Sequence, residues 1–279
     1  MKRFSLESIA VTYYYNSLIT PLLRRMCHVE QLSLRMSFKR AEMERFIDGH
    51  LVHHDIVVHL PRLKRFQFSL YTSLVNVTVP IVIPLNNDVQ RSFAENGFGP
   101  VGSFVECHPV DNQGFCHVYS LPFAFSVFRC LSNGYDRSHD FSRVTTLVMF
   151  GYASFEHQLF ANIAEDFPHL KSLVIYHLSP QKLKNQHRAI DGMPLITFRR
   201  LKKLALCAAH ADYLEQFLVD RITRLPRLHE LQVRFNDLQT LTDDFTNDAA
   251  RRNCSQVIRF KSEESVAPPA SFYAYFPQL

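Results

Sequence analysis

The chain has 279 residues, which allows one large domain or two small ones, since domains commonly hold about 100 to 200 residues. Hydrophobic residues make up 47% of it and charged residues 20%, which is ordinary globular usage and excludes a disordered chain. Eight Gly and 14 Pro exclude collagen-like and linker sequences. The net charge of +5 is a small excess, which by itself favours acidic partners only weakly.

Cysteine usage and hydropathy indicate where the protein resides. Six Cys are spread along the chain without the dense spacing of a secreted disulfide framework, so we expect reduced thiols and a cytoplasmic or nuclear protein. The longest apolar stretch, residues 115–131, is shorter than a membrane-spanning helix and contains Pro122 and Arg129. Glu7 interrupts the apolar run near the N-terminus, which argues against a signal peptide. We therefore expect no membrane partner.

A short phrase recurs along the chain, and it consists of an apolar residue, Pro, any residue and Leu. It occupies residues 60–63, 167–170, 225–228 and 276–279, and the intervals of 107, 58 and 51 residues lie near multiples of about 27. This recurrence predicts a repeating structural unit.

A second pattern, apolar-x-x-apolar-x-apolar, predicts the strands of that unit. Its last two apolar residues are two positions apart, so both point to the same side of an extended segment. The other side of the segment is left exposed to solvent. In chain order its middle residues are Leu32, Phe66, Leu147, Leu173, Leu204, Leu231 and Phe260.

Stretches with helical period separate the later strands. They cover residues 155–163, 214–222 and 238–245, and Asp212 with Glu215 predicts a capping box at the start of the second. Strand, helix and strand at this length predict parallel pairing, because a parallel neighbour requires a crossover of about a dozen residues. Since no single unit covers its own apolar face, the units must stack.

Residues 72–140 break the repeat, and we interpret them as an irregular insertion. Residues 75–83 alternate as a strand does, although Pro80 restricts them to an edge. Residues 103–108 and 115–120 flank a turn-rich segment and predict an antiparallel β-hairpin. If His108 pairs with Phe115, Cys107 faces Cys116 while the nearby His side chains point elsewhere, which disfavours a zinc site.

The repeats resemble leucine-rich-repeat proteins. Residues 228–236 match the L-x-x-L-x-L-x-x-N signature, with Asn236 at its end, whereas the other repeats lack the Asn. The resemblance implies one α/β domain over residues 1–279, a horseshoe-shaped solenoid with a parallel concave sheet, helices on the convex side, and the 72–140 insertion within it.

A closer likeness is to the F-box-like leucine-rich-repeat proteins expanded in bdelloid rotifers. It is carried by residues 60–69, 116–123, 213–218, 244–254 and 275–279. This likeness implies a target-reading subunit of an F-box-type ubiquitin ligase, with a ubiquitin-ligase scaffold as a further partner. An F-box module itself is not visible in the sequence.

Catalytic and cofactor motifs are weak. Residues 97–102 match the pattern G-x-G-x-x-G. A helical run precedes them and a strand-like run follows, whereas a dinucleotide-binding site needs a strand before the pattern and a helix after it. His50 and His54 have the i, i+4 spacing of two metal ligands on a helix, without a carboxylate or third ligand. We therefore expect a protein that is not an enzyme, without cofactor, metal or catalytic residues.

The sequence predicts a scaffold that binds a protein partner on its concave face. Exposed aromatic residues on adjacent strands, rimmed by Arg, have the composition of an interface hot spot. The alternative is that a stripe of basic residues along one edge binds nucleic acid or another acidic partner, which is less favoured because Asp and Glu are interspersed. The residues predicted to contact the partner are Arg35, Gln67, Phe150, Tyr176, Cys207 and Arg234.

Overall fold

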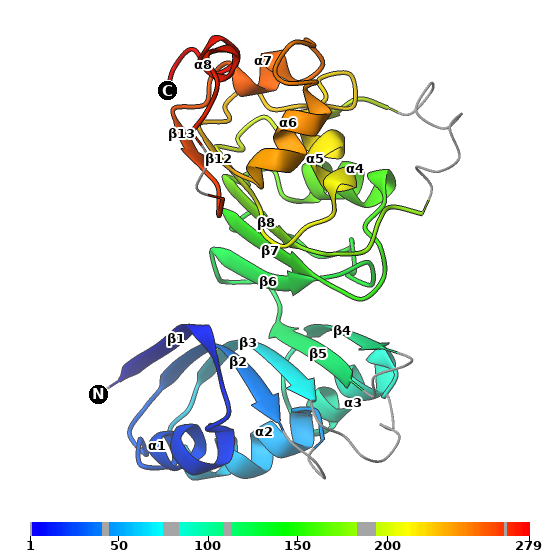
Figure 1. Ribbon diagram of the computed structural model, residues 1–279. Coiled ribbons are helices and arrows are strands. Elements are labelled where there is room, and N and C mark those ends of the chain that lie inside the picture. The colour runs from blue at the N-terminus through cyan, green and yellow to red at the C-terminus, as the bar shows by residue number, and fades with distance from the viewer. Residues whose placement is uncertain (1, 41–44, 75–83, 109–112, 183–193, 265–266) are drawn as a thin grey trace. The chain divides into compact units, whose positions relative to one another are not determined.

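The computed structural model describes residues 2–40, 45–74, 84–108, 113–182, 194–264 and 267–279. The chain forms two compact units (Figure 1). Unit 1 comprises Met1–Phe125 and Gly134–Asp140, and unit 2 comprises Ser126–Asn133 and Phe141–Leu279. The sequence predicted one domain over residues 1–279, whereas the chain has two units, each with its own sheet. Most of the predicted 72–140 insertion belongs to unit 1.

Unit 1 is built on a five-stranded mixed sheet, sheet A, in the order β1-β2-β3-β5-β4. The first three strands are parallel, and β5 runs antiparallel to both β3 and β4. The elements are β1 (Arg3–Thr12), η1 (Tyr15–Ile19), α1 (Thr20–Arg24), β2 (Gln31–Arg40), α2 (Gly49–Asp55), η2 (Val57–His59), β3 (Arg65–Leu74), α3 (Asn86–Glu95), β4 (Val101–His108) and β5 (Gln113–Ser120).

The helices of unit 1 lie on one face of sheet A (Figure 1). The Phe68 ring on β3 stacks on Phe93 of α3 at 5.2 Å, within a core that also contains Leu34. Gly49 opens α2 because α2 passes close to the α3 backbone. A Cβ at this position would lie 2.3 Å from the carbonyl oxygen of Ser92.

The hairpin predicted between residues 103 and 120 is confirmed by β4 and β5, but its predicted register is wrong. Cys107 pairs with Gly114, and Cys116 pairs with Val105. The shift of two residues keeps every side chain on its face, so hydrophobic alternation alone does not fix the register. The hairpin tip at 109–112 and the strand predicted over residues 75–83 lie outside the described residues.

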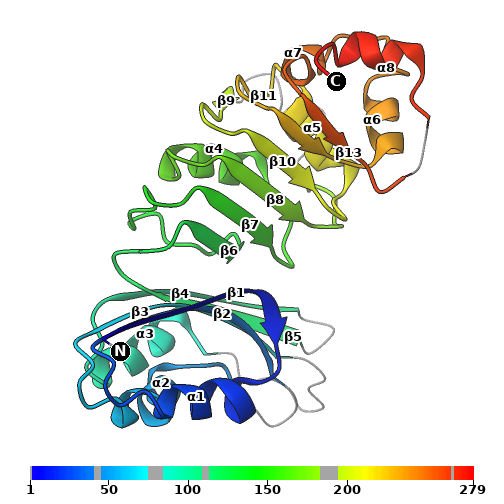
Figure 2. The same cartoon turned by 90° about the vertical axis from the view of Figure 1, so that its left-hand side faces the viewer.

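Unit 2 is built on a six-stranded parallel sheet, sheet B, in the order β13-β12-β10-β8-β7-β6 (Figure 2). The α/β class with parallel strands is therefore confirmed for sheet B, while sheet A is mixed. The elements are β6 (Val127–Leu131), β7 (Thr146–Phe150), α4 (His157–Asp166), β8 (Ser172–Tyr176), β9 (Ile196–Thr197), β10 (Lys203–Leu206), α5 (Ala211–Leu218), β11 (Thr223–Arg224), β12 (Glu230–Gln232), α6 (Phe235–Leu241), α7 (Arg251–Cys254), β13 (Arg259–Lys261) and α8 (Ala270–Tyr275).

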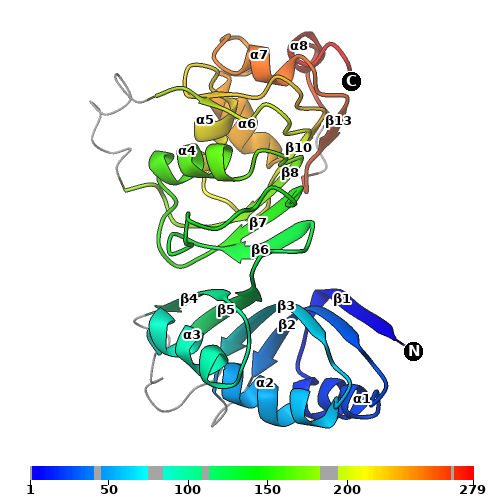
Figure 3. The same ribbon diagram turned by 180° about the vertical axis from the view of Figure 1, so that it is seen from behind.

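One apolar row crosses sheet B in register. Leu147 pairs with Leu173, Leu173 with Leu204, Leu204 with Leu231, and Leu231 with Phe260. The four Leu side chains are almost completely buried, and the helices of unit 2 pack on the side of the sheet that carries them (Figure 3). These residues are the middle members of the predicted triplets, so the strand predictions are confirmed.

Each repeat begins with the same backbone turn. In the apolar-Pro-x-Leu phrase the N–H of Leu170 donates to the carbonyl oxygen of Phe167 at 3.1 Å. The next carbonyl along, that of Lys171, accepts from the N–H groups of both Lys202 and Lys203 at the entry of the neighbouring strand. The apolar-Pro-x-Leu phrase is therefore the turn that connects the end of one helix to the next strand. Pro is favoured at the second position of such a turn.

The predicted capping box at Asp212 is wrong, and the signature Asn is not the buried one. Asn236, the signature Asn, is exposed and bonds to the carboxylate of Glu264. The buried Asn is Asn253, whose amide donates to three carbonyl groups between residues 217 and 223 and whose oxygen accepts from the Leu225 N–H. Helix α5 is capped by His210, which accepts from the N–H of Asp212, so Asp212 is inside the helix.

Replacing Asn253 by Ala should lower the free energy of unfolding by about 3 kcal/mol, because it leaves several buried backbone groups without partners. The matched variant Asn236→Ala should cost less than about 1 kcal/mol, since its backbone and carboxylate partners are exposed. Urea denaturation of both variants measures the difference. Equal losses would contradict this assignment.

His117 makes unit 1 sensitive to acid. It is buried on β5, shares a 2.9 Å hydrogen bond with Ser69, and burial lowers its pKa from 6.5 to about 3. The unfolded chain binds a proton at this residue more tightly than the folded chain does. The contribution of His117 to the free energy of unfolding is therefore present above pH 6.5 and is lost below it, by up to about 1.4 kcal/mol per pH unit. In His117→Gln, stability measured by urea denaturation between pH 7 and 4 should fall less steeply. An unchanged slope would contradict the burial of a neutral imidazole.

Candidate binding face

The face of sheet B opposite its helices is accessible, and we call it the open face. On β7, β8 and β12 the side chains there alternate with the buried ones, as the period of two requires, whereas on β10 Ala205 is itself buried. On β7 and β8 the open-face positions become more exposed toward the strand ends, reaching 36% for Phe150 and 42% for Tyr176. The open face consists of Val127, Arg129, Thr146, Val148, Phe150, Ser172, Val174, Tyr176, Lys203, Ala205, Glu230, Gln232, Arg259 and Lys261.

Phe150 and Tyr176 form the apolar centre of this face. They are register partners at the ends of the adjacent strands β7 and β8, so the predicted adjacency of the two aromatic residues is confirmed. Val148 and Val174, one row earlier, are half-buried and also paired. Two partly exposed aromatic residues next to a pair of Val residues give this end of the face its apolar character.

Cys207 extends the aromatic row toward β10. It directly follows Leu206, the register partner of Ile175, and its N–H donates to the Ile175 carbonyl oxygen at 3.0 Å. Burial raises the pKa of Cys207 above its ordinary value, so the group is a neutral thiol at pH 7. The residue therefore lacks the thiolate character of a nucleophile.

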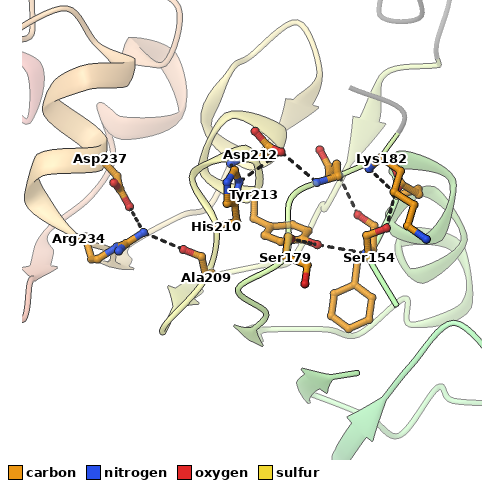
Figure 4. A network of polar contacts seen from close by, with 12 residues as sticks. Ser154, Ser179, Lys182, Ala209, His210, Asp212, Tyr213, Arg234 and Asp237 are labelled. Carbon is orange, nitrogen blue, oxygen red and sulfur yellow. Dashed lines mark hydrogen bonds and ion pairs between the residues drawn. The ribbon is translucent and has the colours of Figure 1, made fainter. Parts of the chain in front are cut away.

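Arg234 bridges successive repeats. Its guanidinium donates to the carbonyl oxygen of Ala209 at 3.2 Å and forms a 2.8 Å ion pair with Asp237 in the first turn of α6 (Figure 4). These contacts hold its orientation, and the side chain is still partly exposed. Arg234 therefore stands at the rim of the open face as a fixed group.

The loops that follow the strands are joined by a polar network (Figure 4). The Tyr213 hydroxyl accepts from the Phe155 N–H and donates to the Ser179 carbonyl, so one side chain connects three repeats. The Asp212 carboxylate accepts from the N–H of Gln181 at 3.0 Å. This network links the repeats through the loops that follow β7, β8 and β10.

Arg35 and Gln67 belong to sheet A of unit 1, whereas the other four predicted contact residues belong to unit 2. Arg35 is only 8% exposed, and its Nε donates to the Glu7 carboxylate at 2.8 Å. Gln67 is half-buried on β3. Arg35 is consequently an internal ion-pair partner of β1, a strand that the sequence analysis did not predict. The open face retains Phe150 and Tyr176, with Cys207 and Arg234 at its border.

A charge ladder that the sequence did not predict lies at the start of three strands. Glu230 on β12 lies between Lys203 on β10 at 3.9 Å and Arg259 on β13 at 2.9 Å. Each of these residues immediately precedes the middle residue of a triplet, so the repeat alignment alone would have brought the three together. The ladder gives the open face a polar border on the side away from the aromatic pair.

Other candidate sites remain separate. His50 bonds to Asn96 and His54 to Asp55, so the two imidazoles have different partners. Gly97, with φ of +74°, lies in the connection between α3 and β4, as the sequence predicted. Across the described residues, no three His, Cys, Asp or Glu side chains are grouped closely enough to hold a metal ion. None of the described helices combines the length and apolarity needed to cross a membrane.

Comparisons with known proteins give no assignment: no protein-family model, curated protein or solved structure matches this chain.

The double variant Phe150→Ser, Tyr176→Ser should lower the free energy of unfolding by no more than about 2 kcal/mol, because both rings are already partly in water. The matched core variant Leu147→Ala, Leu173→Ala should lose at least about 4 kcal/mol, because both side chains are fully buried. Chemical denaturation measures both. A loss from the aromatic variant as large as that from the core variant would show that the rings are part of the core.

Proposed function

We propose that this protein is a non-enzymatic scaffold that binds a protein partner on the open face of sheet B. The observation that carries the proposal is the exposed pair Phe150 and Tyr176, held side by side on two strands of a rigid parallel sheet. A sheet presents such side chains with little loss of conformational entropy on binding, because the backbone is already ordered.

The composition of the face supports a protein partner. Aromatic residues at the centre with charged residues at the border are typical of interface hot spots. The charged residues at the border already form ion pairs, Arg234 with Asp237 and Lys203 with Glu230. They can therefore orient a bound partner, and no unpaired charge is buried when the partner covers them. The affinity would come chiefly from the aromatic centre, and it should depend little on salt.

We further propose that unit 2 is a leucine-rich-repeat-like solenoid of the horseshoe type, with the open face as its concave surface. The sequential order of parallel strands, with helices on one side only, supports this arrangement. On the resemblance described above, the partner would be the target of an F-box-type ubiquitin ligase, and the ligase scaffold would be a second partner.

Affinity capture from native lysate, read by mass spectrometry, tests the proposal. The wild-type chain should retain proteins that the Phe150→Ser, Tyr176→Ser variant loses by about tenfold or more. The matched control is Tyr13→Ser, Tyr14→Ser, which removes two exposed aromatic rings from unit 1 and should retain the same proteins. Recovery of ubiquitin-ligase subunits would support the ligase assignment.

The captures should be repeated at low and high salt. Partners of a hydrophobic face persist in both washes, whereas partners held by charge are released. If both serine variants retain the same set of proteins as the wild type, the open face is not the binding surface and the proposal fails.

A further inference from the structure

A column of cationic side chains runs along the strand-entry edge of unit 2. The turns that precede β7, β8, β10 and β12 cover residues 141–145, 167–171, 198–202 and 225–229. Each has the same form, and together they contain basic residues and no Asp or Glu. We call the six basic residues in these turns the entry column, and they are Arg143, Lys171, Arg199, Arg200, Lys202 and Arg227.

The backbone places these residues at equivalent positions. The carbonyl groups of residues 145, 171 and 202 each accept from two N–H groups at the entry of the next strand, which aligns the turns one above another. Because neighbouring strands of a sheet lie about 4.8 Å apart, four turns place the cations along about 14 Å of the edge. The spacing of the column is therefore fixed by the sheet.

The charges of the column are not neutralised. All six side chains belong to exposed residues, and none forms an ion pair with any residue that the structure describes. The Glu230 carboxylate, at the entry of β12, is already paired with Lys203 and Arg259. An uncompensated row of like charges repels itself, and binding of a polyanion would relieve that repulsion.

The chemistry of the edge favours a phosphodiester chain over an acidic protein. A protein interface needs apolar anchors, and none of the exposed large apolar side chains lies in these four turns. A nucleic-acid strand instead presents a regular row of phosphates along its backbone, which a linear row of cations can follow. Four of the six cations are Arg, whose planar guanidinium matches phosphate oxygens in a bidentate manner.

We propose that the entry column of unit 2 binds the phosphate backbone of single-stranded nucleic acid without sequence preference. The contacts are made with phosphates, because the Phe rings of the turns, Phe141, Phe167 and Phe198, are buried and cannot stack with bases. This surface is separate from the aromatic pair of the open face, because it lies at the beginning of the strands and the pair lies at their ends.

Fluorescence anisotropy with a labelled single-stranded oligothymidylate tests the proposal. The wild-type affinity should fall as the salt concentration is raised from about 50 to 200 mM, with a log–log slope of about −0.7 for each phosphate that the column contacts. The variant Arg200→Ala, Lys202→Ala, Arg227→Ala should bind more weakly, and its slope should be shallower by about 2. Thermal unfolding confirms that these surface changes leave the fold intact.

The matched control Lys182→Ala, Arg252→Ala, Lys261→Ala removes three exposed cations outside the column, and it should retain the wild-type slope. The Phe150→Ser, Tyr176→Ser variant should also bind as the wild type does, which separates this inference from the proposed function. The inference is overturned if the two triple variants weaken binding equally, if the aromatic variant abolishes binding, or if poly-glutamate competes as well as unlabelled oligonucleotide.

Discussion

The rest of unit 2 depends on the in-register packing of one apolar row across sheet B. A single repeat cannot bury its own Leu, because its helix covers only part of the strand. When Leu173 lies between Leu147 and Leu204, each side chain excludes water from the next, and this packing favours the observed register. The alternation of the strand then sends the intervening side chains to the opposite face, which creates the open face.

The same packing separates three chemistries in space. The turns before the strands carry cations, the loops after them carry the polar network of Tyr213 and Arg234, and the strand ends between carry Phe150 and Tyr176. None of these surfaces needs an additional helix or strand. Each one is formed by residues that occupy the same position in successive repeats. A protein partner and a nucleic-acid strand would therefore occupy different edges of one rigid sheet.

The sequence predicts what is local and periodic. The triplet spacing around Leu147 and Leu173 predicts strands because two apolar residues two positions apart define one buried side. It does not reveal β1, β6 or the division into two units, since these depend on contacts between distant segments. Arg35 illustrates the consequence: its position on a strand was predictable, but its partner Glu7 lies on an unpredicted strand. Asn253 was missed because its partners are backbone groups, which leave no sequence signal.

The most direct test of this account is the pattern of cross-strand nuclear Overhauser contacts in sheet B, measured on labelled protein in solution. Backbone contacts should connect Leu147 with Leu173 and Leu173 with Leu204 in the slanted pattern of parallel strands. Close contacts between opposite α protons, which only antiparallel neighbours show, or pairing displaced by two residues, would contradict the single apolar row and with it both surfaces built upon it.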